Sequence, residues 1–515
     1  MLKHKNIERI VSIPLVGSLT KRTGETSTAK DQVFINCFPE ITQNKLTNTS
    51  GAQLTKRTGF AATAATTAGN IARHGCLDVQ SISTNYSLFA FDNTSSDLEI
   101  WSITAGSKAQ VGSTITTDAG CTSITETILA GVTNFVVIAS GGGAAYFFPI
   151  GGAWTQIIDA DFPTEQGTPL VIAGDPVHMD GYMFVLTTSG LIYNSDLNSL
   201  ANWSATNYLS AQSSPDIGVG LARYKEYIIA FGTNSIEFFK NVGNATGSPL
   251  AVVKEATINL GAYYNSNSGR QILQVGETIY WISHNSKTSK VEIYQLENMQ
   301  PKKISTAMID NLLTMGTNDI SHIVGAISLN GKQHILFNTN TSTSTSAAIT
   351  YAYCIESDFW WIFQSSEIFS PVACVSGGLP ANNNNMVCSG TSIAVPNPKI
   401  YYNTGSTPLW KDNSVAYTMT VQTDRLDFDT THRKFVRRMR VEGDTQSATS
   451  NLGVSWSDDD YTTFSTARNI DLSLPDKELP ALGSHKYGRA YKFTHAANTD
   501  CRIKNIELLM DIGIS

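Results

Sequence analysis

The segment Tyr227–Phe239 holds the strand–turn–strand pattern that decides the fold. It reads Tyr227-Ile228-Ile229-Ala230-Phe231, then the polar turn Gly232-Thr233-Asn234-Ser235, then Ile236-Glu237-Phe238-Phe239. β-branched and aromatic residues favour strands, and a stretch with Gly and Asn between two such runs favours a tight turn. The segment therefore predicts a β-hairpin.

Similar hairpin patterns return along the middle of the chain. They recur every ~45–55 residues, a spacing close to that of propeller blades. We therefore expect a β-propeller with short, protected strand edges. Seven copies favour seven blades, although six blades stay open because one copy could belong to another element. The copies are Tyr86–Ile103, Asn134–Pro149, Gly181–Leu197, Glu226–Val242, Glu277–Leu296, Gly331–Phe363 and Asn384–Thr404.

The two ends of the chain do not follow this repeat. Residues 1–60 read as a polar arm and a few strands, and the propeller is expected over residues 61–410. In residues 411–515 polar and apolar positions alternate, as in Leu452–Trp456 and Ala490–His495. This period of two is typical of antiparallel strands with one solvated face. The sequence thus predicts an all-β protein: a propeller with an added antiparallel, β-sandwich-like C-terminal domain.

The composition limits the classes of function. Of the 515 residues, 15% are charged and the net charge is -7. A protein that binds nucleic acid usually has more Lys and Arg than Asp and Glu residues, and this chain does not. No secretory signal opens the chain and no apolar run approaches the ~18–20 residues of a membrane helix. We expect a chain made in the cytoplasm, with no membrane-spanning segment.

Few residues suggest chemistry. The seven cysteines are scattered without metal-ligand spacing, so we expect buried free thiols. Glu237 and Glu292 lie among apolar neighbours; outward-facing positions are expected, with a buried acid as the alternative. No catalytic, cofactor or metal set is recognised, and we expect no enzymatic activity.

Ser457–Phe464 resembles an Asp-box, a hairpin turn of the pattern Ser-x-Asp-x-Gly-x-Thr-aromatic. Ser457, Asp459, Thr463 and Phe464 match this pattern, and Tyr461 stands where Gly is usual. We expect the Asp459 carboxylate to cap backbone N–H groups. Calcium binding by the three adjacent carboxylates is the alternative interpretation.

One basic cluster stands out near the C-terminus. It could contact an acidic partner, or it could be a strand whose outer face carries arginines. A protein partner is favoured over DNA, because few aromatic residues are interleaved. The candidate contact residues are Arg433, Lys434, Arg437, Arg438 and Arg440.

The chain resembles a family of phage proteins. The resemblance rests on Ser213–Gly220, Arg223–Phe239, Ile258–Ala262 and Ile279–His284, on Phe34–Pro39 and Lys56–Phe60 near the start, and on Gly453–Asp459 near the end. These segments are similar to the tail hub proteins of short-tailed phages (podoviruses), also called packaged-DNA stabilisation or tail nozzle proteins. The matching motifs shape hairpins, and no ligand site is carried over.

This resemblance implies a structural virion protein of the phage tail. Such a hub forms a homo-oligomer, usually a six-fold ring, below the portal–adaptor protein. It continues the DNA channel without sequence-specific binding and helps to retain packaged DNA. It also docks tailspikes or tail fibres and is closed by a tail needle or plug. Ring contacts and docking are expected from residues 1–60 and 411–515. The alternative is a propeller-based glycan-binding or sialidase-like protein, supported only by the Asp-box-like turn.

Overall fold

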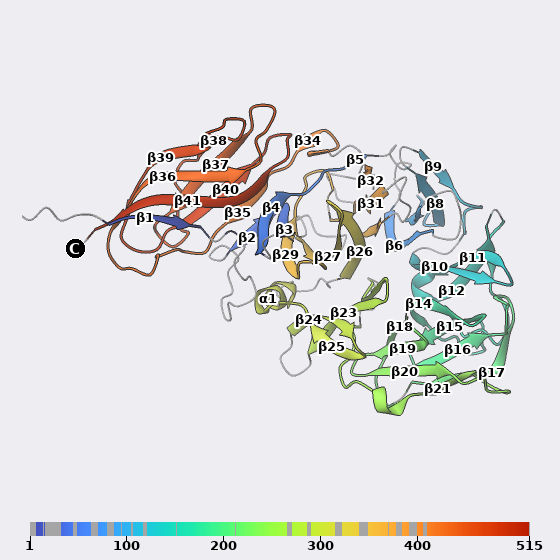
Figure 1. The fold of residues 1–515 in the computed structure, drawn as a ribbon. Helices are drawn as coiled ribbons and strands as arrows, with labels where there is room; N and C mark the ends of the chain where they lie inside the picture. The colour runs from blue at the N-terminus through green and yellow to red at the C-terminus, as the bar shows by residue number, and fades with distance from the viewer. Residues whose placement is uncertain are drawn as a thin grey trace, which may run out of the picture.

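The computed structural model shows two bodies joined side by side: a ring of small sheets and a pair of larger sheets (Figure 1). The ring is drawn mainly in blue-green to yellow, and the pair of sheets mainly in orange and red. The structure describes residues 7–13, 15, 32–44, 49–62, 71–79, 87–93, 95–104, 107–116, 121–150, 152–211, 213–264, 270–285, 290–314, 322–338, 349–368, 370–376, 384–390, 399–404 and 409–513.

The ring is a β-propeller, and the described residues form seven four-stranded antiparallel blades. Five blades are separate sheets, and two more lie within one long sheet. From the inner to the outer strand they are β6 (Ile71–Asp78), β7 (Ser87–Asp92), β8 (Leu98–Thr104) and β9 (Ser107–Gln110); β10 (Cys121–Leu129), β11 (Val132–Ala139), β12 (Ala144–Pro149) and β13 (Thr155–Gln156); β14 (Ile172–Met179), β15 (Tyr182–Thr187), β16 (Leu191–Ser195) and β17 (Trp203–Ser210); β18 (Gly218–Tyr224), β19 (Tyr227–Gly232), β20 (Ile236–Asn241) and β21 (Leu250–Val252); β22 (Ile272–Val275), β23 (Thr278–Asn285), β24 (Lys290–Glu297) and β25 (Gln300–Lys303); β26 (His322–Leu329), β27 (Lys332–Asn338), β28 (Thr350–Cys354) and β29 (Phe359–Phe363); and β30 (Ala373–Ser376), β31 (Asn384–Cys388), β32 (Ile400–Thr404) and β5 (Ala61–Ala62).

The propeller is closed by a strand from the start of the chain. Each inner strand contacts the inner strand of the next blade, and β30 returns to contact β6. The short strand β5 pairs with β32, so it supplies the outermost strand of the last blade. Each copy of the hairpin repeat covers the second and third strands of its blade, and the copy Gly331–Phe363 also includes the fourth strand β29. The predicted propeller is therefore confirmed, with seven blades in the described chain.

The inner strands are crowded around the propeller axis. Five of them, β6, β10, β14, β18 and β26, contain a β-bulge near their first residues. A side chain at Gly174 (φ +68°) would place its Cβ 2.6 Å from the Cα of Gly220 in the next blade. Since an extra residue bends a strand and re-aims its side chains, the bulges shape the wall of the central cavity.

The second body is an antiparallel sandwich to which both ends of the chain contribute. One sheet has the order β3 (Cys37–Asn44), β4 (Thr49–Lys56), β41 (Arg502–Ile512), β36 (Lys434–Gly443), β39 (Glu478–His485), and β1 (Ile7–Ser12) also pairs with β41. The other has the order β38 (Arg468–Asp471), β37 (Asn451–Ser457), β40 (Ala490–His495), β35 (Met419–Gln422), β2 (Val33–Ile35). The predicted C-terminal sandwich is confirmed.

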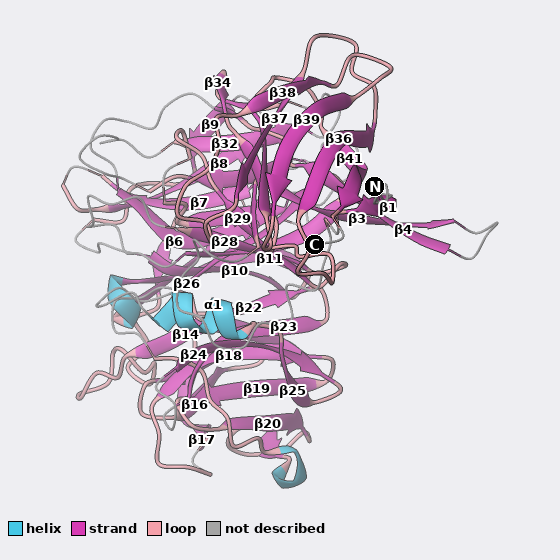
Figure 2. Cartoon of the chain, turned by 90° about the vertical axis from the view of Figure 1, so that its left-hand side faces the viewer, coloured by secondary structure: helices cyan, strands magenta, loops and turns pink. Residues whose placement is uncertain are grey.

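The propeller and the sandwich share one hydrophobic core. Strand β2 pairs with β35 on one side and with β29, the outer strand of the sixth blade, on the other. Trp361 of this blade, Phe38 of the N-terminal strands and Met439 of the sandwich belong to the same buried cluster. The helix α1 (Ala307–Thr314) packs against β24 beside this blade. In Figure 2 the sandwich strands β36, β39 and β41 lie at the top, and the blades that contain β16 and β20 lie at the bottom.

Candidate functional site

A buried ion pair joins the two bodies. Arg57 follows β4, and Asp412 lies in the short strand β33 (Lys411–Asp412) that follows the last blade. The two side chains form a bidentate contact, with Nη2–Oδ2 at 2.6 Å and Nη1–Oδ1 at 3.0 Å. Both are buried. Asp412 Oδ1 also accepts a hydrogen bond from the Phe60 amide at 3.2 Å, next to the closing strand β5.

Further groups of both bodies surround the Arg57 guanidinium. Its Nε donates to Asn36 Oδ1 at 2.9 Å, and Nη2 donates to the carbonyl oxygen of Gln364, after the sixth blade, at 3.3 Å. The ring of Tyr417 lies 3.8 Å from the guanidinium carbon. Buried charges are tolerated when they are paired and hydrogen-bonded. Sequence reasoning missed this junction, although two basic residues beside the apolar Phe60 were a signal.

The neighbouring Lys56 is also buried. Its Nζ donates to the Ala497 carbonyl oxygen at 2.8 Å, and burial lowers the pKa of Lys56 to about 8. Asn330, in the turn between β26 and β27, donates to the Lys56 carbonyl oxygen at 3.1 Å and accepts from the Thr58 amide at 3.2 Å. Residues 56–60 therefore connect the sandwich, the sixth blade and the closing strand.

The predicted basic strand is β36, which lies between β41 and the edge strand β39 of the six-stranded sheet. Arg433, Arg437, Arg438 and Arg440 are exposed, whereas Lys434 points into the protein. Lys434 Nζ donates to the carbonyl oxygens of Thr430 at 2.5 Å and Lys486 at 3.0 Å. Strand alternation explains this difference. A bulge between Val436 and Arg438 leaves both Arg437 and Arg438 on the solvent side.

Acidic residues accompany these arginines. Arg438 Nη1 lies 3.1 Å from Glu478 Oε2, and Arg437 Nε lies 2.5 Å from Asp511 Oδ2. Arg440 stands opposite Glu478 on one neighbouring strand and Glu507 on the other. The exposed Phe435 and Ile10 add apolar area to the same sheet. We call Ile10, Phe435, Arg437, Arg438 and Arg440 the outer sheet face; the acidic residues that pair with its arginines make this surface more suited to a protein than to DNA.

The Asp-box-like segment forms the expected turn. Asp459 Oδ1 accepts from the Ser457 hydroxyl at 2.8 Å and from the Thr463 amide at 2.9 Å. Hydrogen bonds from Thr463 lower the pKa of Asp459 to about 2. Tyr461, where Gly is usual, has φ +65°, which explains that preference. Asp458 points elsewhere and pairs with the buried Arg489 at 2.6 Å, so the carboxylates do not converge.

Glu237 and Glu292 are both buried, so the expectation that they face outward is wrong. Glu237 accepts from the Ser213 amide at 2.9 Å. Glu292 accepts from the Tyr294 hydroxyl at 2.8 Å and pairs with Lys303 at 2.7 Å. Hydrogen bonds from neighbouring groups compensate the cost of burying the two carboxylates, which the alternation of polar and apolar residues alone would place outward. Both carboxylates connect elements of the propeller.

The residues around the clearest hairpin also have structural roles. Asp216 Oδ2 accepts from the Asn234 amide at 2.7 Å and the Ser235 hydroxyl at 3.1 Å, and so caps the β19–β20 turn. A Cβ at Gly218 would lie 2.3 Å from the Thr187 carbonyl oxygen in the preceding blade. This segment fixes a turn and a close contact between two blades.

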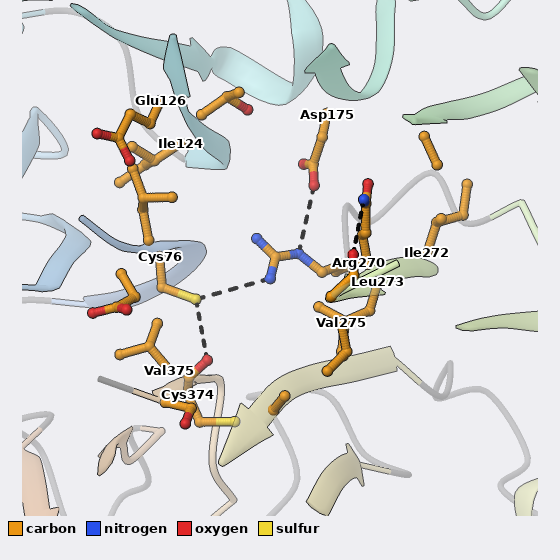
Figure 3. Close-up of a pocket in the computed structure, with 18 of the residues that line it drawn as sticks. Cys76, Ile124, Glu126, Asp175, Arg270, Ile272, Leu273, Val275, Cys374 and Val375 are labelled. Atoms are coloured by element: carbon orange, nitrogen blue, oxygen red, sulfur yellow. Dashed lines mark hydrogen bonds and ion pairs between the residues drawn. The ribbon is translucent and has the colours of Figure 1, made fainter. Parts of the chain in front are cut away.

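A solvent-open central cavity of about 1000 Å³ lies in the propeller, lined by residues of, or next to, all seven inner strands. Figure 3 shows Arg270 projecting into it between Asp175 and Cys76. Six cysteines are described as free and buried, and burial raises the thiol pKa of each: Cys37, Cys76, Cys354, Cys374, Cys388 and Cys501. This confirms the expectation for these six; the side chain of Cys121 lies outside the described residues.

No group of three or more His, Cys, Asp or Glu side chains is placed to hold a metal ion in the described ranges. No helix of the described chain is long and apolar enough to cross a membrane.

Comparison with known proteins gives one family match. The family model described as Phage_stabilise, "Bacteriophage P22 Gp10, beta-propeller", matches residues 83–369. No curated protein matches the chain.

Three of the solved structures that match this chain are distantly similar to it. The WD40 β-propeller domain of Doa1 has 10% identity and a TM-score of 0.40, covering 67% of this chain and 97% of its own. The computationally designed Ika8 protein has 7% identity and a TM-score of 0.36, covering 67% and 100%. An exo-β-1,3-galactanase from Phanerochaete chrysosporium has 9% identity and a TM-score of 0.30, covering 79% and 98%.

Proposed function

The chain belongs to the Phage_stabilise family, the tail hub and DNA-stabilisation proteins represented by bacteriophage P22 Gp10, and we propose that it forms the ring-shaped hub of a short phage tail. In this proposal the ring sits below the portal–adaptor, continues the DNA channel, helps to retain the packaged genome and docks tailspikes or fibres. The observation that carries the proposal is the family match over residues 83–369. Family membership favours a structural role in the virion over catalysis.

The DNA path in this proposal runs between subunits and not through the propeller. Duplex grooves about 8.5 and 7.5 Å deep make DNA at least about 16 Å wide, so one turn of about 34 Å occupies roughly 7,000 Å³. The central cavity holds about 1000 Å³. The conduit must therefore be built by several copies around a common axis. A net charge of -7 suits a wall that DNA passes without binding.

The junction at Arg57 supports a mechanical role. A hub that retains a packaged genome has to resist outward force without its domains separating. Here the sandwich, the sixth blade and the closing strand meet at one buried ion pair, inside a shared core. Force on the sandwich is thereby transmitted to the propeller through buried contacts.

The hairpin β3–β4 is our candidate for a ring contact. Its strands pair from Cys37 with Lys56 to Asn44 with Thr49, but β4 pairs with β41 only at Leu54 and Thr55. Beyond Glu40 and Gln53 the two strands have no other described strand beside them, and the hairpin projects from the molecule (Figure 2). An isolated two-stranded hairpin is marginally stable in water, and its free edges favour pairing with another chain. We propose that it packs on the adjacent subunit.

Docking of tailspikes or fibres is assigned in this proposal to the outer sheet face. Its exposed Phe435 and Ile10 lie in the same sheet as three arginines and their acidic partners, a mixture typical of protein interfaces. Arg433 adds another exposed arginine next to this face, whereas Lys434 is buried and bonds to backbone carbonyl oxygens inside the protein.

The hairpin offers a direct test. Glu40 and Gln53 are cross-strand partners, with Gln53 Nε2 donating to Glu40 Oε2 at 2.9 Å. Replacing residues 41–52 by Asn-Gly closes a two-residue turn at this pair. The shortened protein should melt like the unaltered one but remain a monomer, as measured by analytical ultracentrifugation.

A matched control shortens a loop at the far side of the propeller. Val242 and Pro249 are hydrogen-bonded across the β20–β21 connection, so residues 243–248 can be replaced by Asn-Gly in the same way. The control should still assemble. Rings formed equally well by both variants would contradict the assignment of the hairpin, and an unaltered protein that never forms rings would contradict the hub proposal.

A further inference from the structure

The central cavity contains a guanidinium group with few partners. The Arg270 side chain is only 11% exposed, and it lies before β22, close to the propeller axis. Its contacts are an ion pair of Nε with Asp175 Oδ2 at 3.8 Å and a contact of Nη1 with Cys76 Sγ at 4.0 Å. Nε is buried without a hydrogen bond. Since a buried donor without an acceptor is costly, this group is suited to an anionic ligand.

The backbone aims an acidic group at the same space. In β14 the bulge between Ala173 and Val177 places Asp175 opposite the guanidinium, and Asp175 is 36% exposed. Bulges commonly re-aim side chains beside functional sites. At 3.8 Å the pair is longer than a hydrogen bond, so each charge retains capacity for another partner. Figure 3 shows both residues on the cavity.

The rest of the lining sets the size and polarity of a ligand. Glu126 and Asp78 add negative charge to the wall, so a simple anion would meet repulsion. A ligand with charges of both signs would satisfy Arg270 without this penalty. The rest of the wall mixes polar side chains, such as Thr125 and Gln274, with aliphatic ones: Ile124, Val177, Leu221, Ile272, Leu273 and Val375. A volume of about 1000 Å³ accommodates a small molecule.

We propose that this cavity binds a small amino-carboxylate, with the ligand carboxylate on Arg270 and its ammonium group on Asp175. The ligand would then connect Asp175 in the third blade with Arg270, which immediately precedes the inner strand of the fifth blade. This inference does not depend on the tail-hub role, because the site lies within one subunit.

Thermal unfolding and isothermal titration of the full chain test the site. The probes are glycine, alanine, glutamate and γ-aminobutyrate, with acetate and methylamine as single-charge controls. A ligand of this size binds with a Kd of about 1 mM to 10 µM, so about 10 mM saturates the site. At least one amino-carboxylate should raise the melting temperature by roughly 1–4 °C, whereas acetate and methylamine should bind more weakly.

Two variants assign the contacts. Arg270→Gln should weaken amino-carboxylate binding by about 10- to 100-fold, and Arg223→Gln, an exposed arginine of β18, is the matched control and should bind normally. Asp175→Asn should remove the preference for amino-carboxylates over acetate and retain acetate binding, which tests the site even if Arg270→Gln fails to fold. Equal binding of acetate to the unaltered protein, an unchanged affinity in Asp175→Asn, or no response to any probe would overturn the proposal.

Discussion

Replacing Asp412 by Asn tests whether the buried ion pair connects the two bodies. Arg57 and Asp412 are 0% and 1% exposed, and the substitution leaves the guanidinium buried without its counter-charge. Breaking a buried pair of this kind costs about 3–5 kcal/mol. Nε retains Asn36, and Nη1 retains the Thr58 carbonyl oxygen at 3.0 Å. We therefore expect the free energy of unfolding to fall by about 3 kcal/mol, the lower end of that range, from a total of about 5–15 kcal/mol.

The assay is denaturant unfolding followed by circular dichroism and by tryptophan fluorescence. Trp361 reports on the propeller side of the shared core and Trp456 on the sandwich side; coincident transitions justify a single free energy of unfolding. The control is Glu226→Gln, which removes the exposed ion pair with Lys240 and should cost less than about 1 kcal/mol. If Asp412→Asn lowers the free energy by no more than the control does, the reasoning about the junction is refuted.

Three further predictions concern other parts of the molecule. Burial lowers the pKa of His334 to about 3, so between pH 6.5 and pH 3 the unfolded chain binds one more proton at this residue than the folded chain does. The free energy of unfolding therefore falls as the pH falls, by about 2 kcal/mol for this residue at pH 5. His334→Gln should flatten the dependence of the unfolding midpoint on pH between 7.5 and 5, and the same change at the exposed His432 should not. Gly218→Ala places a Cβ 2.3 Å from the Thr187 carbonyl oxygen, so it should destabilise the protein by about 2 kcal/mol in a melt, whereas Gly167→Ala meets no atom within 4 Å and should not. The pair Arg438→Gln and Arg440→Gln should leave the melting temperature unchanged but weaken capture of a tailspike or fibre in a pull-down, while Lys240→Gln with Lys302→Gln on the propeller should leave capture normal.

The repeated hairpin was readable from sequence because strand propensity and turn chemistry are local. Tyr227–Phe239 contains both strands and their turn, and its counterparts are the middle strands of every blade. The closing strand β5 could not be read in this way, because Ala61 and Ala62 carry no strand signal and pair with residues more than 300 positions away. For the same reason the mixing of N-terminal strands into the C-terminal sandwich was not foreseen.

The functional residues show the same limit. The basic strand is recognisable in the sequence as a cluster of arginine and lysine residues. The structure shows that Lys434 of this cluster points inward, whereas the arginines are exposed. The burial of Glu237 and Glu292 depends on partners that only the fold brings together. Asp412 and Arg270 show no local pattern, and the basic pair Lys56-Arg57 does not reveal its partners, because these side chains are defined by contacts with distant segments.

The most direct test of the central claim is an electron-microscopy reconstruction of the purified full-length protein, alone and mixed with portal–adaptor complexes. The hub proposal predicts a six-fold ring below the portal, with the propellers at its periphery and the DNA path between subunits. A chain that remains monomeric in both samples, or a ring whose axis runs through a single propeller, would contradict it.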